Sequence, residues 1–432
     1  LSGLTWQEGS QKVWEQANAK ENSWYVRLKN SSGQYQDITA SMLGISFDPS
    51  AALEEAWAIG HATDASGKKD IFELQQDIAA AKNTTYSFTS AQQSANTAPI
   101  DEILATLQNV AYKAPQDAAM LSFNPDDTSN PFTFQQEVYG QWLDVTAVKE
   151  QILEMVSTLQ SGEILLETTL IAPSVTVAEL EKNVELRFRA TTAISKNSTE
   201  DRTNNIRVAF ERINGTILQD NKTFSFNTAV GRREAGNGYY PAIEYAYGNE
   251  VMGIGGGVCQ ASTTVYLAAI QAGLKINKRE AHSNPVNYTE MGMDATVNST
   301  RGHEVDFTFT NNTGSPIYIS AHVISSSSNK KNLMCEVRIY GKSLENVSYQ
   351  LVSETVEVLP KPEEPVLVKD EDGENVVYED ETKLRSKGRD GYVVEAYLIT
   401  FTDGVETDRT RVSRDTYAAR ADRYWVGVTP RY

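Results

Sequence analysis

A run of glycines in the middle of the chain constrains its folding more than any other feature. Gly253-Ile254-Gly255-Gly256-Gly257 is followed directly by Val258-Cys259-Gln260-Ala261. Glycine permits sharp turns and close backbone approach, and the apolar spacing after Cys259 predicts a helix beginning near it. A helix N-terminus has unpaired N–H groups and a partial positive charge, which favour the thiolate form of cysteine. The segment therefore predicts a nucleophilic thiol at a tight junction between loop and helix.

The start of this helix also predicts a substrate-binding surface around the thiol. Residues at i+3, i+4 and i+7 share the face of Cys259 and are expected to line a cleft: Ser262, Thr263 and Tyr266. Backbone N–H groups at the junction could form an oxyanion hole, in which each donor contributes about 3 kcal/mol. The residues expected to shape or supply that hole are Gly257, Val258, Cys259 and Gln260.

A histidine and a carboxylate complete the predicted catalytic group. His282 follows the helix at a distance that one return of the chain can close, and it is the predicted base that takes the thiol proton. His303 is the alternative base. Asp294 is the predicted third residue, which holds the histidine tautomer, and the alternatives are Asp306 and Ser283. Arg301, with Arg232 and Arg279 as alternatives, is the predicted partner of substrate carboxylates.

Some of the cysteines and histidines also have simpler, structural interpretations. Cys335 lies in an alternating segment with Val337 and Ile339, which predicts a buried strand position. A Cys259–Cys335 disulfide is the alternative for both cysteines, although such a bridge has no need of adjacent glycines. His61 and His322 are interpreted as structural. A zinc site at Cys259 and His282 is conceivable, but no closely spaced ligand pair supports it, so we expect no metal.

Composition limits the partners of the chain. The formal charge of −18 argues against nucleic acid and other polyanions. The glycine run lacks the lysine of a phosphate loop, so we expect no nucleotide and no other cofactor. No run of eighteen apolar residues is present, and the first residue, Leu1, suggests that a signal or anchor segment has been removed. The sequence does not establish an oligomeric state.

Mixed helical and strand signals along the chain predict a multidomain α+β protein. An N-terminal α+β domain is assigned to residues 1–182 and a central catalytic α+β domain to residues 183–345. Residues 346–432 are expected to form a small β module containing several glycines.

The central residues resemble the VanW domain family. The segments that support this resemblance are Asn214-Gly215, Phe224-Ser225-Phe226-Asn227, Val230-Gly231-Arg232, Gly238-Tyr239-Tyr240-Pro241-Ala242, Gly255 to Tyr266, Arg279-Glu280-Ala281-His282-Ser283, Val286-Asn287-Tyr288 and Gly292 to Val297. They cover about a third of the chain. More weakly, residues before about 180 resemble the peptidoglycan-binding-like domain that commonly precedes VanW domains. The tail resembles the glycine-bearing β module that often follows them.

The resemblance implies a bacterial cell-envelope protein outside the membrane, held by an N-terminal segment absent from this chain. VanW domains are associated with glycopeptide-resistance clusters, and some are described as L,D-transpeptidases that form 3–3 peptidoglycan cross-links. The implied partners are peptidoglycan stem peptides, and Cys259 matches the implied catalytic cysteine. The alternative is a non-catalytic wall-binding protein whose glycine segment only shapes a peptide cleft.

Overall fold

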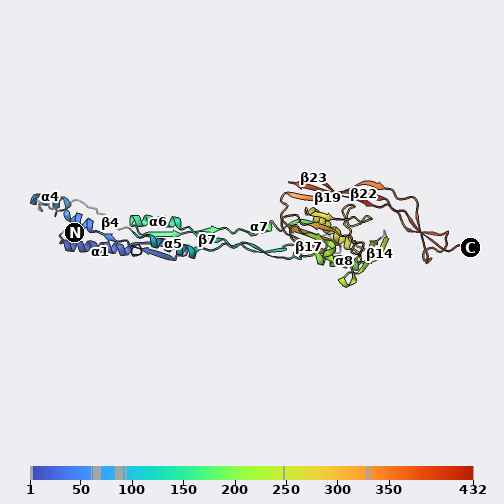
Figure 1. Ribbon diagram of the computed structural model, residues 1–432, viewed down its shortest axis with the longest axis horizontal. Coiled ribbons are helices and arrows are strands. Elements are labelled where there is room, and N and C mark those ends of the chain that lie inside the picture. The colour runs from blue at the N-terminus through green and yellow to red at the C-terminus, as the bar shows by residue number, and fades with distance from the viewer. Residues whose placement is uncertain are drawn as a thin grey trace. The chain divides into compact units, whose positions relative to one another are not determined.

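The computed structural model describes residues 3–59, 61, 70–82, 91–92, 95–246, 249–326, 329 and 332–431. It is a multidomain α+β protein, as the sequence predicts (Figure 1). Contacts within the chain define two compact units. The first contains Leu1–Asp117 and Glu137–Ser174, and the second contains Ala118–Gln136 and Val175–Tyr432. The hairpin at 118–136 therefore packs with the second unit.

The first unit is built around a small sheet of order β2-β1-β8, in which β1 pairs antiparallel with β2 and parallel with β8. Its first helix begins with the predicted capping box, since Thr5 and Glu8 bond each other's backbone N–H groups. Its elements are α1 (Trp6–Ser23), β1 (Tyr25–Asn30), β2 (Tyr35–Thr39), α2 (Ala40–Leu43), β3 (Phe47–Asp48), α3 (Ser50–Ala58), α4 (Ile71–Lys82), β4 (Ala91–Gln92), α5 (Ala98–Ala111), β7 (Gly140–Leu143), α6 (Val145–Thr158), β8 (Gly162–Leu166) and β9 (Thr168–Ile171).

The second unit carries the glycine segment, and its central sheet has the order β10-β18-β17-β11. Its elements up to residue 341 are β5 (Ala119–Phe123), β6 (Phe132–Gln135), α7 (Val177–Glu181), β10 (Glu185–Ala193), α8 (Glu200–Ile213), β11 (Thr216–Leu218), β12 (Thr223–Ser225), α9 (Phe226–Val230), the 3-10 helix η1 (Ala235–Asn237), β13 (Pro241–Ala246), β14 (Asn249–Ile254), α10 (Val258–Gln271), β15 (Lys275–Lys278), β16 (Thr308–Thr310), β17 (Ile317–Ser325) and β18 (Leu333–Gly341).

Helix α10 lies at the centre of this unit. It packs against β10 and β18 of the sheet and against α8. Small and apolar residues such as Ala261, Val265 and Ala268 are fully buried along it. A helix that is apolar on most of its surface must be enclosed by other elements, and burial of this surface stabilises the unit. The residue that α10 presents at its first turn is therefore held on a rigid scaffold.

The C-terminal residues form the predicted β module. Its strands are β19 (Val347–Leu359), β20 (Val366–Lys369), β21 (Thr382–Ser386), β22 (Gly391–Thr402), β23 (Val405–Tyr417) and β24 (Arg423–Val426). The long strands pair antiparallel in the order β19-β22-β23, and β20, β24 and β21 form a second sheet. The backbone N–H of Leu351 in β19 donates to the Gln271 side chain at 3.2 Å, so this module contacts the end of α10.

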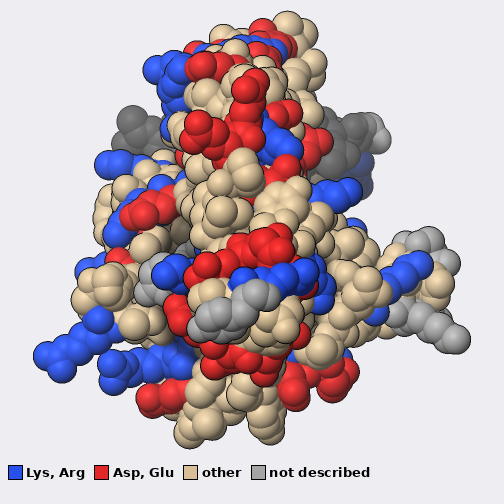
Figure 2. Space-filling model, turned by 90° about the vertical axis from the view of Figure 1, so that its right-hand side faces the viewer, with Lys and Arg blue, Asp and Glu red and all other residues tan. Residues whose placement is uncertain are grey.

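Charged side chains of both signs occur together on the face of the molecule shown in Figure 2. Figure 2 shows Asp and Glu interspersed with Lys and Arg on the face turned to the viewer. This mixture means that the net charge of −18 does not form one continuous acidic patch on that face. Within the described residues, no helix is long and apolar enough to cross a membrane.

Candidate functional site

The glycine segment makes the tight junction that its sequence predicts. Gly255 and Gly257 have φ angles of +96° and +102°, a backbone conformation that side chains with a Cβ rarely adopt. At Gly256 a Cβ would lie 2.7 Å from the carbonyl oxygens of Ala242 and Ile243. The Asn205 side chain from α8 donates to the Gly256 carbonyl at 3.0 Å and fixes the loop. Glycine is therefore required where the chain turns into α10.

Cys259 occupies the first turn of α10 and is half-buried. Its sulfur lies 3.4 Å from the Val297 carbonyl and 3.7 Å from the Thr296 hydroxyl. Both cysteines are free thiols, and Cys335 is fully buried in β18. The strand position predicted for Cys335 is confirmed, and the alternative disulfide is absent.

The loop after β15 brings His282 and Asp294 to Cys259. The Nδ1 atom of His282 lies 2.5 Å from Asp294 Oδ2, and the His282 backbone N–H donates to the same oxygen at 2.6 Å. The His282 ring also hydrogen-bonds the Cys259 sulfur. Because Nδ1 is held by the carboxylate, Nε2 is the nitrogen available to the sulfur. The structure thus places the three predicted catalytic side chains in one hydrogen-bonded series.

The C-terminal module supplies two further residues to this series. The Tyr417 hydroxyl donates to Asp294 Oδ1 at 2.6 Å and accepts from the Gly292 backbone N–H at 2.6 Å. Arg279 lies between Asp294 and the module. Its Nε donates to the Asp294 carbonyl at 2.5 Å, and its Nη1 to Asp415 at 2.5 Å. The buried carboxylate of Asp294 is therefore held from both the loop and β23.

These contacts set the protonation states of the site. Burial alone would raise the pKa of Cys259, but the hydrogen bond and charge of His282 lower the pKa of this thiol to about 7. Burial would lower the pKa of His282, but its hydrogen bonds to Asp294 and Cys259 raise that pKa to about 9. Burial likewise opposes ionisation of Asp294, yet donation from His282 and Tyr417 lowers the pKa of Asp294. Near neutral pH the site therefore favours a thiolate–imidazolium pair.

The predicted cleft residues on α10 contact protein atoms. Ser262 donates to the Ala295 carbonyl at 2.5 Å, and Thr263 accepts from the Ala295 backbone N–H at 3.0 Å. Tyr266 is buried below them. Arg301 is exposed in a turn. Ser262 and Thr263 thus bind the Asp294-bearing segment to α10, while the Tyr266 ring meets Phe307 edge-on. Direct contact of these three residues and of Arg301 with substrate stays a prediction.

Two of the four backbone donors at the junction are occupied. Val258 N–H donates to the Gly255 carbonyl at 3.1 Å, and Gln260 N–H donates to the Gly257 carbonyl at 2.9 Å. The Gln260 side chain accepts from Arg202 at 3.0 Å and donates to the Ala193 carbonyl at 3.0 Å. Within the described residues, the N–H groups of Gly257 and Cys259 have no such acceptor. The Cys259 N–H belongs to the same residue as the sulfur, so it is the proposed donor for an oxyanion.

The alternative catalytic residues lie elsewhere. Asp306 accepts from the Ser225 hydroxyl at 2.6 Å and from the Asn227 backbone N–H at 2.8 Å, so it fixes the start of α9. His303 and Ser283 are exposed. Tyr288 was not expected in the site. Its ring lies edge-on to His282 with 6.5 Å between centroids, and its hydroxyl hydrogen-bonds Thr263. No local spacing in the sequence indicates this contact.

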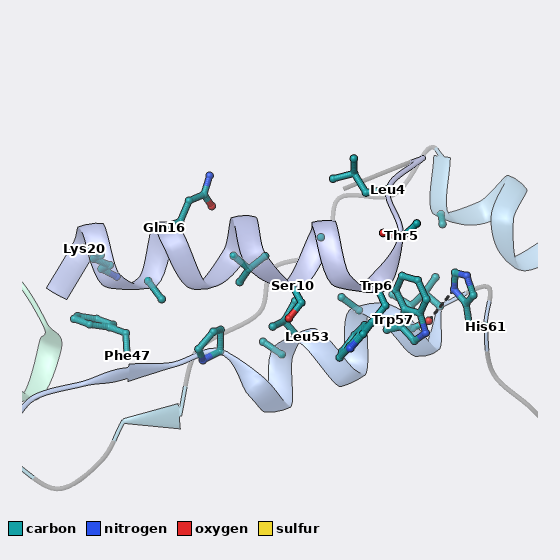
Figure 3. A pocket seen from close by; sticks show the side chains of 18 of the residues that line it. Leu4, Thr5, Trp6, Ser10, Gln16, Lys20, Phe47, Leu53, Trp57 and His61 are labelled. Atoms are coloured by element: carbon teal, nitrogen blue, oxygen red, sulfur yellow. Dashed lines mark hydrogen bonds between the residues drawn. The ribbon is translucent and has the colours of Figure 1, made fainter. Parts of the chain in front are cut away.

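Metal-binding residues and an apolar pocket are the other features that could form a site. In the described part of the chain, no group of three or more His, Cys, Asp or Glu residues could hold a metal ion. The first unit has a pocket of about 960 Å³ between α1 and α3, shown in Figure 3. In it His61 stacks on Trp57 at 4.1 Å, and Trp6 meets Trp57 edge-on. Its described lining contains no cysteine, and the Nδ1 atom of His61 lies 3.1 Å from the Trp57 carbonyl.

The fold and site define a protein with two recognisable domains. Residues 201–334 match the family model described as VanW like protein, and residues 345–426 match that of the G5 domain. The Cys259–His282–Asp294 series lies in the VanW-like domain, while Tyr417 and Asp415 lie in the G5 domain. Both domain families are cell-wall associated.

Among known proteins, the chain is 40% identical over 124 residues to the uncharacterized protein YoaR of Bacillus subtilis (strain 168). The match covers 29% of this chain and 40% of YoaR, so the chain spans less than half of that relative. Two solved structures also match. One, titled IgA1 Protease G5 domain structure, has 20% identity and a TM-score of 0.13 over 20% of this chain and 94% of its own. The other, titled Crystal structure of HP0197-G5, has 18% identity and a TM-score of 0.11 over 18% and 97%.

The protonation states predict a characteristic thiol reactivity. The alkylation rate of Cys259 by iodoacetamide should rise with pH with an apparent pKa of about 7, because the thiolate is the reacting form. In His282→Ala the apparent pKa should rise above about 8.5, since burial remains and the imidazolium is lost. The rates are measured by mass spectrometry across pH 5 to 10.

Cys335 provides the matched control for this measurement. It is fully buried, and burial raises its pKa to about 12, so Cys335→Ala should leave the alkylation profile unchanged. A wild-type apparent pKa of about 8.5 or more would show that Cys259 and His282 do not form the ion pair.

The contact from the G5 domain predicts a local loss of stability. Tyr417→Phe removes a donor to a buried carboxylate and an acceptor for Gly292 N–H, so local opening should become easier by about 1.5–3 kcal/mol. Amide hydrogen exchange of the peptide containing Gly292 should accelerate about tenfold or more. Tyr397→Phe is the control, since its hydroxyl donates to Glu395 within the same module. Equal exchange in the two variants would contradict the role of Tyr417.

Proposed function

We propose that the chain is a peptidoglycan L,D-transpeptidase that forms 3–3 cross-links through a cysteine acyl-enzyme. The carrying observation is the hydrogen-bonded series Cys259–His282–Asp294 at the N-terminus of α10. A nucleophile, a base held in one tautomer and a free backbone N–H beside them are the parts that acyl transfer requires. The cell-wall association of both domain families supports wall stem peptides as substrate, and the protein is proposed to be extracytoplasmic and membrane-anchored.

The proposed reaction has two balanced halves. The Cys259 thiolate attacks the carbonyl carbon of the third stem residue, and the Cys259 N–H stabilises the resulting oxyanion. The carbon–nitrogen bond then breaks, and the His282 imidazolium gives its proton to the departing D-alanine amine. A side-chain amine of a second stem attacks the thioester, His282 takes its proton, and the thiolate leaves. Water in place of this amine would give a carboxypeptidase side activity.

The flanking regions are proposed to assist this chemistry. Residues 183–345 are the proposed catalytic domain, and residues 1–182 are proposed to be a peptidoglycan-binding-like domain. Residues 346–432 form the proposed β module, from which Asp415 contacts the catalytic loop through Arg279. The alternative function is non-catalytic binding of wall peptides in the same cleft.

The nucleophile is tested with disaccharide-tetrapeptide as substrate. The wild type should release D-alanine and form a cross-linked dimer, and Cys259→Ala should abolish both products. Cys335→Ala should retain both, because that thiol is buried away from the site. Chromatography with mass spectrometry separates the products. Activity that persists in Cys259→Ala would exclude the assigned nucleophile, and a wild type that only binds the substrate would favour the non-catalytic alternative.

The carboxylate is tested by Asp294→Asn, which keeps the shape of the side chain. The amide provides a weaker acceptor for the His282 ring and no negative charge for the imidazolium, so kcat should fall about 100-fold or more. The iodoacetamide profile should shift to higher pH at the same time. A variant with unchanged kcat and thiol pKa would remove Asp294 from the catalytic group.

A further inference from the structure

Arg233 lies beside the glycine segment, and its charged guanidinium group lacks hydrogen-bond partners. Its Nη1 and Nη2 atoms are closed to solvent and have no hydrogen-bond partner within the described residues. The other arginines around the site differ, because their guanidinium groups donate to protein acceptors: Arg202 to Gln260, Arg212 to the Asn237 carbonyl, and Arg279 to Asp415. A buried guanidinium without partners is costly, and arginine does not lose its charge to avoid that cost.

The position of Arg233 links it to the nucleophile. Its side-chain stem packs on Gly255, where an added Cβ would lie 2.8 Å from Arg233 Cβ and Cγ. Its guanidinium lies 6.0 Å from the centre of the Phe226 ring. Burial lowers the pKa of Arg233, and the negative charge of the Cys259 thiolate opposes that shift. Gly255 and Phe226 thus hold a positive charge within electrostatic reach of the sulfur.

Nearby protein groups do not neutralise this charge. Asp306 is within electrostatic reach, but its two oxygens accept from Ser225 and from the Asn227 backbone. Tyr239 donates its hydroxyl to the Val230 carbonyl at 3.2 Å. Within the described residues this guanidinium therefore has no acceptor, and an anion from outside the chain would supply one. A carboxylate suits a guanidinium best, since it accepts two parallel N–H bonds.

We propose that Arg233 binds the terminal carboxylate of the acyl donor. This proposal rests on the proposed function, in which the attacked carbonyl is followed by one terminal residue, D-alanine. The carboxylate of that residue lies next to the scissile bond, on the side of the leaving amine. A donor extended by a further residue has an amide at this place, which cannot form the ion pair. Arg233 would therefore select tetrapeptide stems over pentapeptide stems.

The test compares disaccharide-tetrapeptide with its C-terminal amide. The wild type should prefer the acid by about 100-fold in kcat/KM, which corresponds to about 2.7 kcal/mol and is the scale of a hydrogen-bonded charged group. Arg233→Met keeps the stem that packs on Gly255 and Phe226 but removes the charge. The ratio of kcat/KM for the acid to that for the amide should therefore fall to about unity, because kcat/KM for the acid decreases. Arg233→Lys should retain part of the preference for the acid. Arg207→Met, a change at an arginine of α8 that pairs with Glu200 and has no proposed role in the site, should retain it fully.

A stability measurement separates binding from folding. Because the guanidinium is buried and unpaired, Arg233→Met should unfold at a temperature equal to or above that of the wild type. Loss of the acid preference in a protein of undiminished stability supports the proposal. An acid preference that survives in Arg233→Met overturns it.

A binding measurement separates this proposal from the proposed function. Calorimetry in the Cys259→Ala background needs no turnover. The Cys259→Ala protein should bind the acid more strongly than the amide, and the double variant with Arg233→Met should bind the two equally. This result supports the carboxylate site even if the wild type forms no cross-links. Equal binding of acid and amide in the Cys259→Ala protein overturns the carboxylate site even if the wild type is an active transpeptidase.

Discussion

The site depends on the buried carboxylate of Asp294. Its side chain is fully closed to solvent, and a charge in that position requires several donors to offset its lost hydration. The donors come from His282, Tyr417 and more distantly Arg279. They reach it from a loop of the VanW-like domain and from a strand of the G5 domain. The histidine ring is therefore fixed only where both domains are folded and packed together.

Helix α10 and the Asp294 segment form one rigid support for the thiol. The Ser262 and Thr263 hydroxyls bond the Ala295 backbone, which ties the segment next to Asp294 to the turn that carries Cys259. The buried α10 cannot shift without disturbing the sheet on which it packs. In the proposed acyl transfer, side chains held in this way would keep their geometry before substrate arrives, and such preorganisation is where much of the rate enhancement of acyl-transfer enzymes originates.

The sequence predicts the parts of the site that local chemistry determines. The glycines before Cys259, the helix after it and the buried strand of Cys335 follow from backbone freedom and periodicity, and the structure contains all three. Helix register also predicts that Ser262 shares the face of Cys259, but register cannot tell whether a cleft or another segment covers that face. Tyr417 contacts Asp294 across 123 residues, and no periodicity signals such a contact. The sequence also does not show that Arg233 lacks a hydrogen-bond partner, because this depends on the tertiary packing around it.

The charges of the site explain why one arginine remains unpaired. When the thiolate–imidazolium pair forms, His282 balances Cys259 and Arg279 balances Asp415, while Asp294 is solvated by its donors. Arg233 then stabilises the thiolate from a distance. A bound donor carboxylate would neutralise Arg233 and remove that stabilisation, which makes the thiolate more basic and more nucleophilic at the moment its substrate is in place. When D-alanine leaves with its carboxylate, the positive charge of Arg233 would again be unpaired beside the uncharged thioester. There it would favour the next step, in which the Cys259 thiolate is released from the thioester. An arginine without a protein partner can thus serve recognition and activation together.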